Sequence, residues 1–172
     1  MKILLISLPR TGSNSLMKRY ANQYNLEMIG EPFHNKQIEK YKDFDWEKND
    51  NFIMKTIIDQ LPFNETDTLN FWYQFHQIFD QTILLSRRDL VSCAESLAFA
   101  SYYDNEGYWF KKYSWVETPN LDIIHNYVIF LNDMMNKLKN KLNKNIIYYE
   151  EIFDQDSPER LRINKRKNNK LF

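Results

Sequence analysis

The sequence contains little glycine and almost no cysteine, with three and one of them among 172 residues. The single Cys93 cannot form an internal disulfide, and no group of cysteine and histidine residues has the spacing of a zinc site. No apolar run approaches the 18 or so residues of a membrane-spanning helix, and no signal-peptide pattern precedes the first strand pattern. We therefore expect a cytoplasmic protein with no metal site and no membrane partner.

The chain also has no excess of charge, because its formal net charge is zero. The charges are unevenly placed, however, since the segment 160–172 carries six basic residues and no acidic one. The part before it is acidic, which argues against nucleic acid as a partner. The length predicts a single domain, 1–159, followed by a basic C-terminal tail, 160–172. Such a tail is either solvated or folded over an anionic ligand.

Strand and helix patterns alternate along the domain. Apolar runs typical of buried strands lie at residues 3–7, 27–29, 52–55, 82–86 and 145–149. Helical spacing of apolar residues is found at 13–24 and 121–142, and also in the segments that follow a cap at Thr66 or Asp67 and that follow Asp89. The segment 35–50 is polar and typical of an irregular surface loop. This order predicts an α/β fold in which a parallel sheet has helices on both faces.

The segment between the first strand and the first helix is the most informative part of the chain. It reads Pro9-Arg10-Thr11-Gly12-Ser13-Asn14-Ser15. A tight loop that opens a helix points backbone N–H groups and the positive end of the helix dipole at one place, which favours an anion. It is not a Walker A loop, because the second glycine and the lysine of that motif are missing. The alternative is an ordinary strand–turn–helix unit without a ligand.

Charged residues follow four of the strand patterns. Arg10, Glu31, Lys55 and Arg87 each lie at the end of a predicted strand or just after it. Ligands of parallel sheets bind beyond the carboxyl ends of the strands, so these four side chains are expected to converge on one site. A histidine, His34, lies close to Glu31 in the sequence. For Lys55 a surface position is an equal alternative, and for His34 a solvated loop position is the alternative.

Two of these segments resemble the donor-binding elements of sulfotransferases that use 3′-phosphoadenosine 5′-phosphosulfate (PAPS). The segment Pro9–Ser13 is similar to their 5′-phosphosulfate loop, with the pattern P-[KR]-[ST]-G-[ST]. An arginine at a strand end and a serine eight or nine residues later resemble their 3′-phosphate element. Arg87 and Arg88 both satisfy this spacing to Ser96; Arg87 is preferred because it directly continues the strand, and Arg88 stays open as the alternative.

Two further segments extend the resemblance over residues 1–153. Gly30-Glu31-Pro32-Phe33 is similar to a G-E-P-F segment of bacterial and carbohydrate-type members, and residues 147–152 are similar to a late Y-E-[DE]-[IL] strand end. The resemblance implies a P-loop-like three-layer fold and transfer of a sulfuryl group from PAPS to a hydroxyl acceptor, a carbohydrate or a small metabolite, with 3′,5′-bisphosphoadenosine (PAP) as product. It implies that Glu31 is the general base, with His34 as the alternative.

The implied roles of the remaining site residues follow the same resemblance. Arg10 and the loop residues hold and polarise the 5′ group, while Lys55 stabilises the leaving oxygen. The donor is held by Arg10, Thr11, Gly12, Ser13, Asn14, Ser15, Arg87 or Arg88, and Ser96. No metal is needed for this chemistry.

The chain departs from the sulfotransferase pattern in two segments. The strand end at Lys55 lacks the histidine of steroid- and phenol-type members, and their late R-K-G-x-x-G-D-W segment is absent. Because the chain is short, its acceptor-binding elements are either reduced or supplied by a second subunit of a homodimer. Two alternatives stay open. A small-molecule kinase would need Mg²⁺ and a lysine where the loop has Asn14-Ser15, and a non-catalytic nucleotide-binding module would bind without transfer.

Overall fold

The computed structural model describes residues 1–34, 37–61, 63–103 and 121–153, so the basic tail lies outside the described residues. Within these ranges, five strands form one sheet in the order β2-β3-β1-β4-β5. All four ladders are parallel, as the alternation of patterns predicts. The strands are β1 (Lys2–Ser7), β2 (Glu27–Gly30), β3 (Phe52–Ile57), β4 (Gln81–Ser86) and β5 (Ile146–Tyr148).

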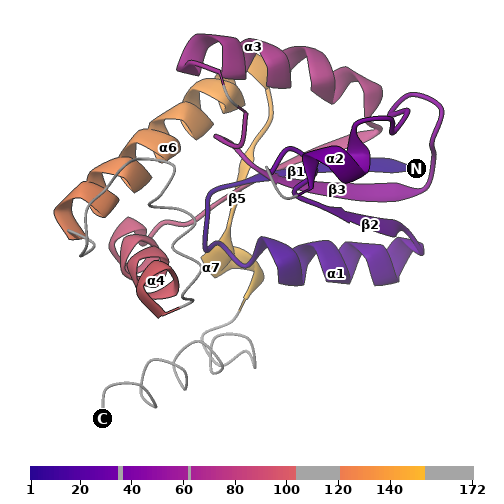
Figure 1. Cartoon of the computed structure of the whole chain (residues 1–172). Helices are drawn as coiled ribbons and strands as arrows, with labels where there is room; N and C mark the ends of the chain where they lie inside the picture. Colours follow the sequence, from indigo (N-terminus) through magenta and orange to yellow (C-terminus); the bar gives the residue numbers. More distant parts are fainter. Residues whose placement is uncertain (35–36, 62, 104–120, 154–172) are drawn as a thin grey trace.

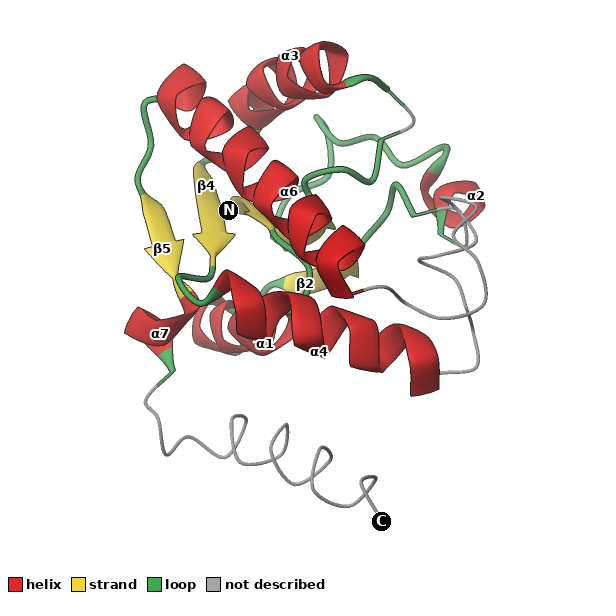
Figure 2. Ribbon diagram, turned by 90° about the vertical axis from the view of Figure 1, so that its left-hand side faces the viewer, coloured by secondary structure: helices red, strands yellow, loops and turns green. Residues whose placement is uncertain are grey.

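Helices cover both faces of the sheet (Figure 1). One face is covered by α1 (Ser13–Tyr24) and the short α7 (Tyr149–Ile152), and the other by α3 (Glu65–Phe75) and α6 (Leu121–Leu142). A helical turn, η1 (His76–Ile78), follows α3, and α4 (Leu90–Tyr103) packs against α6 (Figure 2). The predicted three-layer arrangement is confirmed. No helix of the described ranges is both long and apolar enough to cross a bilayer.

The central strand β1 shows why residues 3–6 form an unbroken apolar run. Ile3 and Leu5 pack against α1, whereas Leu4 and Ile6 pack against α3 and α6, and all four side chains are fully buried. Successive side chains of a strand point to opposite faces, so a strand covered on both sides needs an unbroken apolar run. The run in β1 therefore places its carboxyl end, where the candidate loop begins, in the middle of the sheet.

The stretch 35–50 is not the irregular surface loop that its polarity predicts. It contains the short helix α2 (Ile38–Tyr41), and Tyr41, Phe44 and Trp46 pack against the main core. The Phe44 and Trp46 ring centroids are 4.4 Å apart, and both rings also contact Phe52 of β3. The prediction was wrong here because these three aromatic residues pack against the core although their spacing has neither helical nor strand periodicity.

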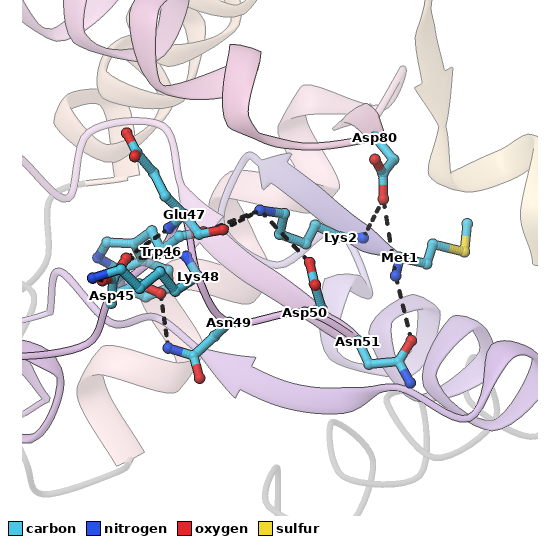
Figure 3. A network of polar contacts seen from close by, with 10 residues as sticks. All are labelled: Met1, Lys2, Asp45, Trp46, Glu47, Lys48, Asn49, Asp50, Asn51 and Asp80. Carbon is cyan, nitrogen blue, oxygen red and sulfur yellow. Dashed lines mark hydrogen bonds and ion pairs between the residues drawn. The ribbon is translucent and has the colours of Figure 1, made fainter.

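Polar contacts hold the same stretch to the amino edge of the sheet (Figure 3). Lys2 Nζ donates to the carbonyl oxygens of Glu47, at 2.9 Å, and Trp46, at 3.4 Å. The backbone N–H of Lys2 donates to Asp80 Oδ2 at 2.7 Å. These contacts lie at the end of the strands opposite to the one that bears the candidate site residues.

Two predicted element boundaries need correction. Helix α3 is capped by Asn64, whose Oδ1 accepts the backbone N–H of Asp67 at 2.9 Å, and not by Thr66 or Asp67. Tyr149 belongs to α7 and not to the last strand, because its ring packs with Phe153 one turn later. The expected start of α4 at Asp89 is confirmed, since Asp89 Oδ1 accepts the N–H of Ser92 at 2.9 Å.

Candidate functional site

The loop between β1 and α1 is held in shape by bonds from three directions. The Thr11 side chain is buried, and its hydroxyl donates to the carbonyl of Leu8 at 2.8 Å. The Cys93 thiol of α4 donates to the carbonyl of Pro9 at 3.0 Å, and the backbone N–H of Leu8 donates to Leu85 of β4 at 3.1 Å. The side chain of Thr11 therefore shapes the loop from inside the protein.

Gly12 gives the loop its turn into α1. Its φ of 70° lies in the left-handed region, and a Cβ at this position would lie 2.8 Å from Cε2 of Tyr149. The carbonyl of Gly12 accepts the N–H groups of Ser15 and Leu16, at 3.0 and 3.1 Å. Helix geometry leaves the earlier N–H groups, those of Ser13 and Asn14, without an acceptor inside the helix. The start of α1 therefore has the backbone geometry on which the predicted anion site depends, and anion binding there stays a prediction.

Arg10 joins this loop to helix α4. Its backbone also adopts a left-handed conformation, with φ at 61°. Its Nε donates to Oγ of Ser96 at 3.2 Å, and Ser96 is buried on the side of α4 that faces the loop. The structure thus brings Ser96 to Arg10, although the sequence pairs Ser96 with Arg87 or Arg88.

Arg87 lies inward at the end of β4. Its side chain is only 12% exposed, and its guanidinium lies 5.1 Å from the ring centroid of Tyr149, the residue that covers Gly12. Its Nε is buried and has no hydrogen-bond partner among the described residues, and Oε1 of Glu150 lies 3.7 Å away. Arg87 therefore brings a largely buried cation, ion-paired with Glu150, close to the loop between β1 and α1.

Arg88 points elsewhere. Its side chain is 62% exposed, pairs with Glu151 and lies 4.7 Å from the ring centroid of Tyr148. The backbone N–H groups of Arg88 and Asp89 are accepted by the Glu150 carboxylate at 3.1 and 3.3 Å. A hollow of about 470 Å³ adjoins these residues; it is lined by Arg87, Arg88, Leu90, Asn132 and Tyr148.

Cys93 of α4 is buried against the loop and within electrostatic range of Arg10 and Arg87. Burial raises the pKa of its thiol to about 12, and the positive charges of Arg87 and Arg10 oppose that rise. The thiol is therefore protonated at neutral pH, and Cys93 serves as a packing and hydrogen-bonding residue rather than as a nucleophile. Its electrostatic interaction with both guanidinium groups shows that Arg10 and Arg87 approach the same part of α4.

A second cluster lies beyond β2 and β3. Lys55, at the carboxyl end of β3, is only 3% exposed and pairs with Oε1 of Glu31. Glu31 takes a left-handed backbone with φ at 51°, and its N–H donates to the carbonyl of Lys55 at 2.6 Å. The surface alternative for Lys55 is thereby excluded. His34 is half-buried, and its backbone N–H donates to the carbonyl of Glu31 at 2.9 Å.

Sequence reasoning missed one member of this cluster. Gln60, on the loop after β3, is buried, and its Nε2 donates to Oε2 of Glu31 at 2.6 Å. A lone glutamine in a loop belongs to no motif, and the signal that could have found it is only its position after the strand that carries Lys55. In the described ranges, no group of three or more histidine, cysteine or acidic side chains is arranged to hold a metal ion.

Comparison with known proteins identifies the fold. No protein-family model and no curated protein sequence matches the chain. Shikimate kinase from Bacteroides thetaiotaomicron is similar with a TM-score of 0.56 at 12% identity, over 100% of this chain and 99% of that chain. The YorR protein from Bacillus subtilis, solved with phosphorylated GDP, is similar with a TM-score of 0.50 at 8% identity, over 100% and 99%. The predicted α/β, P-loop-like three-layer fold is thus confirmed.

Proposed function

We propose that the chain is a PAPS-dependent sulfotransferase that transfers a sulfuryl group to a hydroxyl of a carbohydrate or small metabolite. The observation that carries this proposal is the placement of Arg87. Its side chain is only 12% exposed, and its Nε has no hydrogen-bond partner in the described part of the chain, although Glu150 lies within ion-pair distance. It also lies against Tyr149, which covers Gly12 of the loop that is predicted to bind an anion. A donor with separate phosphates on its 5′ and 3′ oxygens needs two such anion sites.

The residues present fit a donor of this kind. The amides at the start of α1 and the guanidinium of Arg10 would hold the 5′ group, since arginine binds oxyanions through several parallel donors. Arg87 and Ser96 would hold the 3′-phosphate, and the inward position of Arg87 favours it over Arg88. When bound, PAPS supplies an activated sulfuryl group whose sulfur–oxygen bond to phosphate breaks as the bond to the acceptor oxygen forms, leaving PAP.

Glu31 would accept the proton of the acceptor hydroxyl at its carboxylate. Lys55 pairs with one oxygen of this carboxylate, so in this proposal it would also orient the base. Its stabilisation of the leaving oxygen stays a prediction. A carboxylate that is fixed by its neighbours and reaches the carboxyl edge of the sheet has the geometry of a general base. His34, on the same turn, is the alternative base.

A second candidate is phosphoryl transfer to a small molecule. It is favoured by the similarity of the fold to shikimate kinase. The loop between β1 and α1, however, offers Arg10 and no lysine, whereas a P-loop kinase uses a lysine on the transferred phosphate. This candidate predicts binding of ATP that depends on Mg²⁺, and a non-catalytic module predicts nucleotide binding without any transfer.

Calorimetry with PAP, 5′-AMP and ATP, each with and without Mg²⁺, separates these functions. We expect PAP to bind at least tenfold more tightly than 5′-AMP, because charge-assisted contacts to one more phosphate contribute roughly 1.5–3 kcal/mol. We also expect transfer of label from ³⁵S-labelled PAPS to a member of a panel of sugars and small alcohols. Equal affinity for PAP and 5′-AMP, or tight binding of ATP only with Mg²⁺, would overturn the proposal.

A further inference from the structure

Gln60 is held so that its amide has one orientation only. Its Oε1 accepts the hydroxyl of Thr56 at 3.0 Å and the backbone N–H of Ile57 at 3.2 Å. The backbone N–H of Ile57 can only donate, so the oxygen of the amide must face β3 and the nitrogen must face away from it. The nitrogen then meets Oε2 of Glu31, to which it donates at 2.6 Å.

The loop that carries Gln60 is anchored from three sides. Trp72 of α3 donates from Nε1 to the carbonyl of Ile58 at 2.9 Å, and the N–H of Ile58 donates to Ser7 of β1 at 3.1 Å. Tyr127 of α6 donates from its hydroxyl to the carboxylate of Asp59. Because the central strand and the two helices of one layer, α3 and α6, hold this loop, its position is fixed by contacts other than the one with Glu31.

We propose that Gln60 is a positioning residue that fixes the Glu31 carboxylate for proton transfer. This inference rests on the proposed function, in which Glu31 is the base. Lys55 holds Oε1 and Gln60 holds Oε2, so the carboxylate cannot rotate about its last side-chain bond, which is otherwise a soft torsion. Each oxygen keeps a lone pair for the proton of an acceptor hydroxyl.

The loss of Gln60 should act on the chemical step and leave donor binding intact. Neither Gln60 nor Glu31 belongs to the loop before α1 or to α4, which carry the proposed phosphate contacts. A base must lie within hydrogen-bond reach of the proton it takes, and a displacement of about 1 Å can cost about 100-fold in rate. The expected signature is a lower kcat at nearly unchanged KM for the acceptor and unchanged affinity for PAP.

The variant Gln60→Glu tests this directly. A glutamate keeps an oxygen that can accept from Thr56 and Ile57, but it replaces the amide nitrogen that donates to Glu31 with a carboxylate oxygen, which repels the Glu31 carboxylate. We expect kcat to fall about 10- to 100-fold, with the PAP dissociation constant within about twofold of wild type. Gln74→Glu, the same change at an exposed position of α3, should leave kcat unchanged. A kcat for Gln60→Glu equal to that of Gln74→Glu would overturn the inference.

A spectroscopic measurement tests the contact without any acceptor. In ¹⁵N-resolved NMR spectra, a side-chain amide proton of Gln60 that is bonded to a carboxylate should lie downfield of its geminal partner and should exchange slowly. In Glu31→Ala this separation should collapse, whereas in Gln74→Glu it should persist. Identical Gln60 amide signals in wild type and Glu31→Ala would overturn the inference, even if PAP binding and sulfuryl transfer support the proposed function. A protein that binds PAP no better than 5′-AMP would instead remove the proposed function itself.

Discussion

Arg10 donates from Nε to the hydroxyl oxygen of Ser96 at 3.2 Å, and this bond links the loop after β1 to helix α4. One turn earlier on α4, Cys93 donates to the carbonyl of Pro9. A hydroxyl that accepts one hydrogen bond can still donate its own hydrogen. Ser96 can therefore orient Arg10 and at the same time offer a donor to a phosphate, which would make the two anion contacts interdependent.

Substitutions of Arg87 and Arg88 should have different effects on the preference for PAP over 5′-AMP. Arg87→Met should reduce the preference for PAP over 5′-AMP by about 10- to 100-fold, because a charge-assisted contact to the extra phosphate is lost. Arg88→Met should change it by less than about threefold, since Arg88 is mostly exposed and its contribution is screened by solvent. Calorimetric titration of both variants with both nucleotides measures the ratio. A larger effect at Arg88 would reassign the 3′-phosphate contact.

Replacing the proposed base should affect transfer and spare binding. Glu31→Gln keeps the shape of the side chain and an acceptor for Lys55, but it cannot take a proton. Transfer of ³⁵S label should fall by about 10²- to 10⁴-fold, while the PAP dissociation constant stays near that of wild type. His34→Ala is the companion variant. Full activity of Glu31→Gln together with loss in His34→Ala would move the base to His34.

The two described glycines should respond differently to alanine. At Gly12 a Cβ would lie 2.8 Å from the Tyr149 ring and φ is 70°, so Gly12→Ala should lower the free energy of unfolding by roughly 1–3 kcal/mol. At Gly30 a Cβ would have no other atom within 4 Å, so Gly30→Ala should change the free energy of unfolding by less than about 1 kcal/mol. Urea unfolding of both variants gives the comparison. Equal losses would mean that the loop relaxes around the added methyl group.

The loop between β1 and α1 and the layers could be predicted from the sequence because each depends on local signals. Apolar runs mark β1 and β4, seven buried residues at helical spacing mark α6, and the loop before α1 has its turn glycine and hydroxyl residues in order. These features follow from strand and helix periods and from the needs of a helix N-terminus.

The pairing within the second cluster could not be predicted in the same way. The contact of Lys55 with Glu31 requires β2 and β3 to be neighbours and requires a left-handed residue immediately after β2. Neither condition produces a periodic pattern of residues in the sequence. The aromatic residues of 41–46 were missed for a related reason, because their burial depends on Phe52 and α3 and not on any local pattern.

The stability of the protein should depend on the ionisation of Cys93 at alkaline pH. Burial raises the pKa of this thiol from 9.0 to about 12 in the folded state, so unfolding above pH 9 releases a proton. The stabilisation is complete below about pH 9 and is lost as pH rises toward 12, by about 1.4 kcal/mol per pH unit. Unfolding free energies of wild type and Cys93→Ala should therefore converge between pH 8 and 10.5. A constant difference over this range would contradict the raised pKa.

The left-handed backbone at Arg10 should lower the thermal stability of the protein, while the Arg10 side chain serves the proposed reaction. A side chain at this φ costs about 1–2 kcal/mol relative to glycine, and the hydrogen bond to Ser96 contributes roughly 0.5–1.5 kcal/mol. Arg10→Gly should thus unfold at a temperature equal to or above that of wild type, and above that of Arg10→Ala, while its affinity for PAP falls at least tenfold. An Arg10→Gly protein less stable than Arg10→Ala would contradict this reasoning. Selection for heat resistance alone would replace this arginine by glycine, and selection for turnover would restore it.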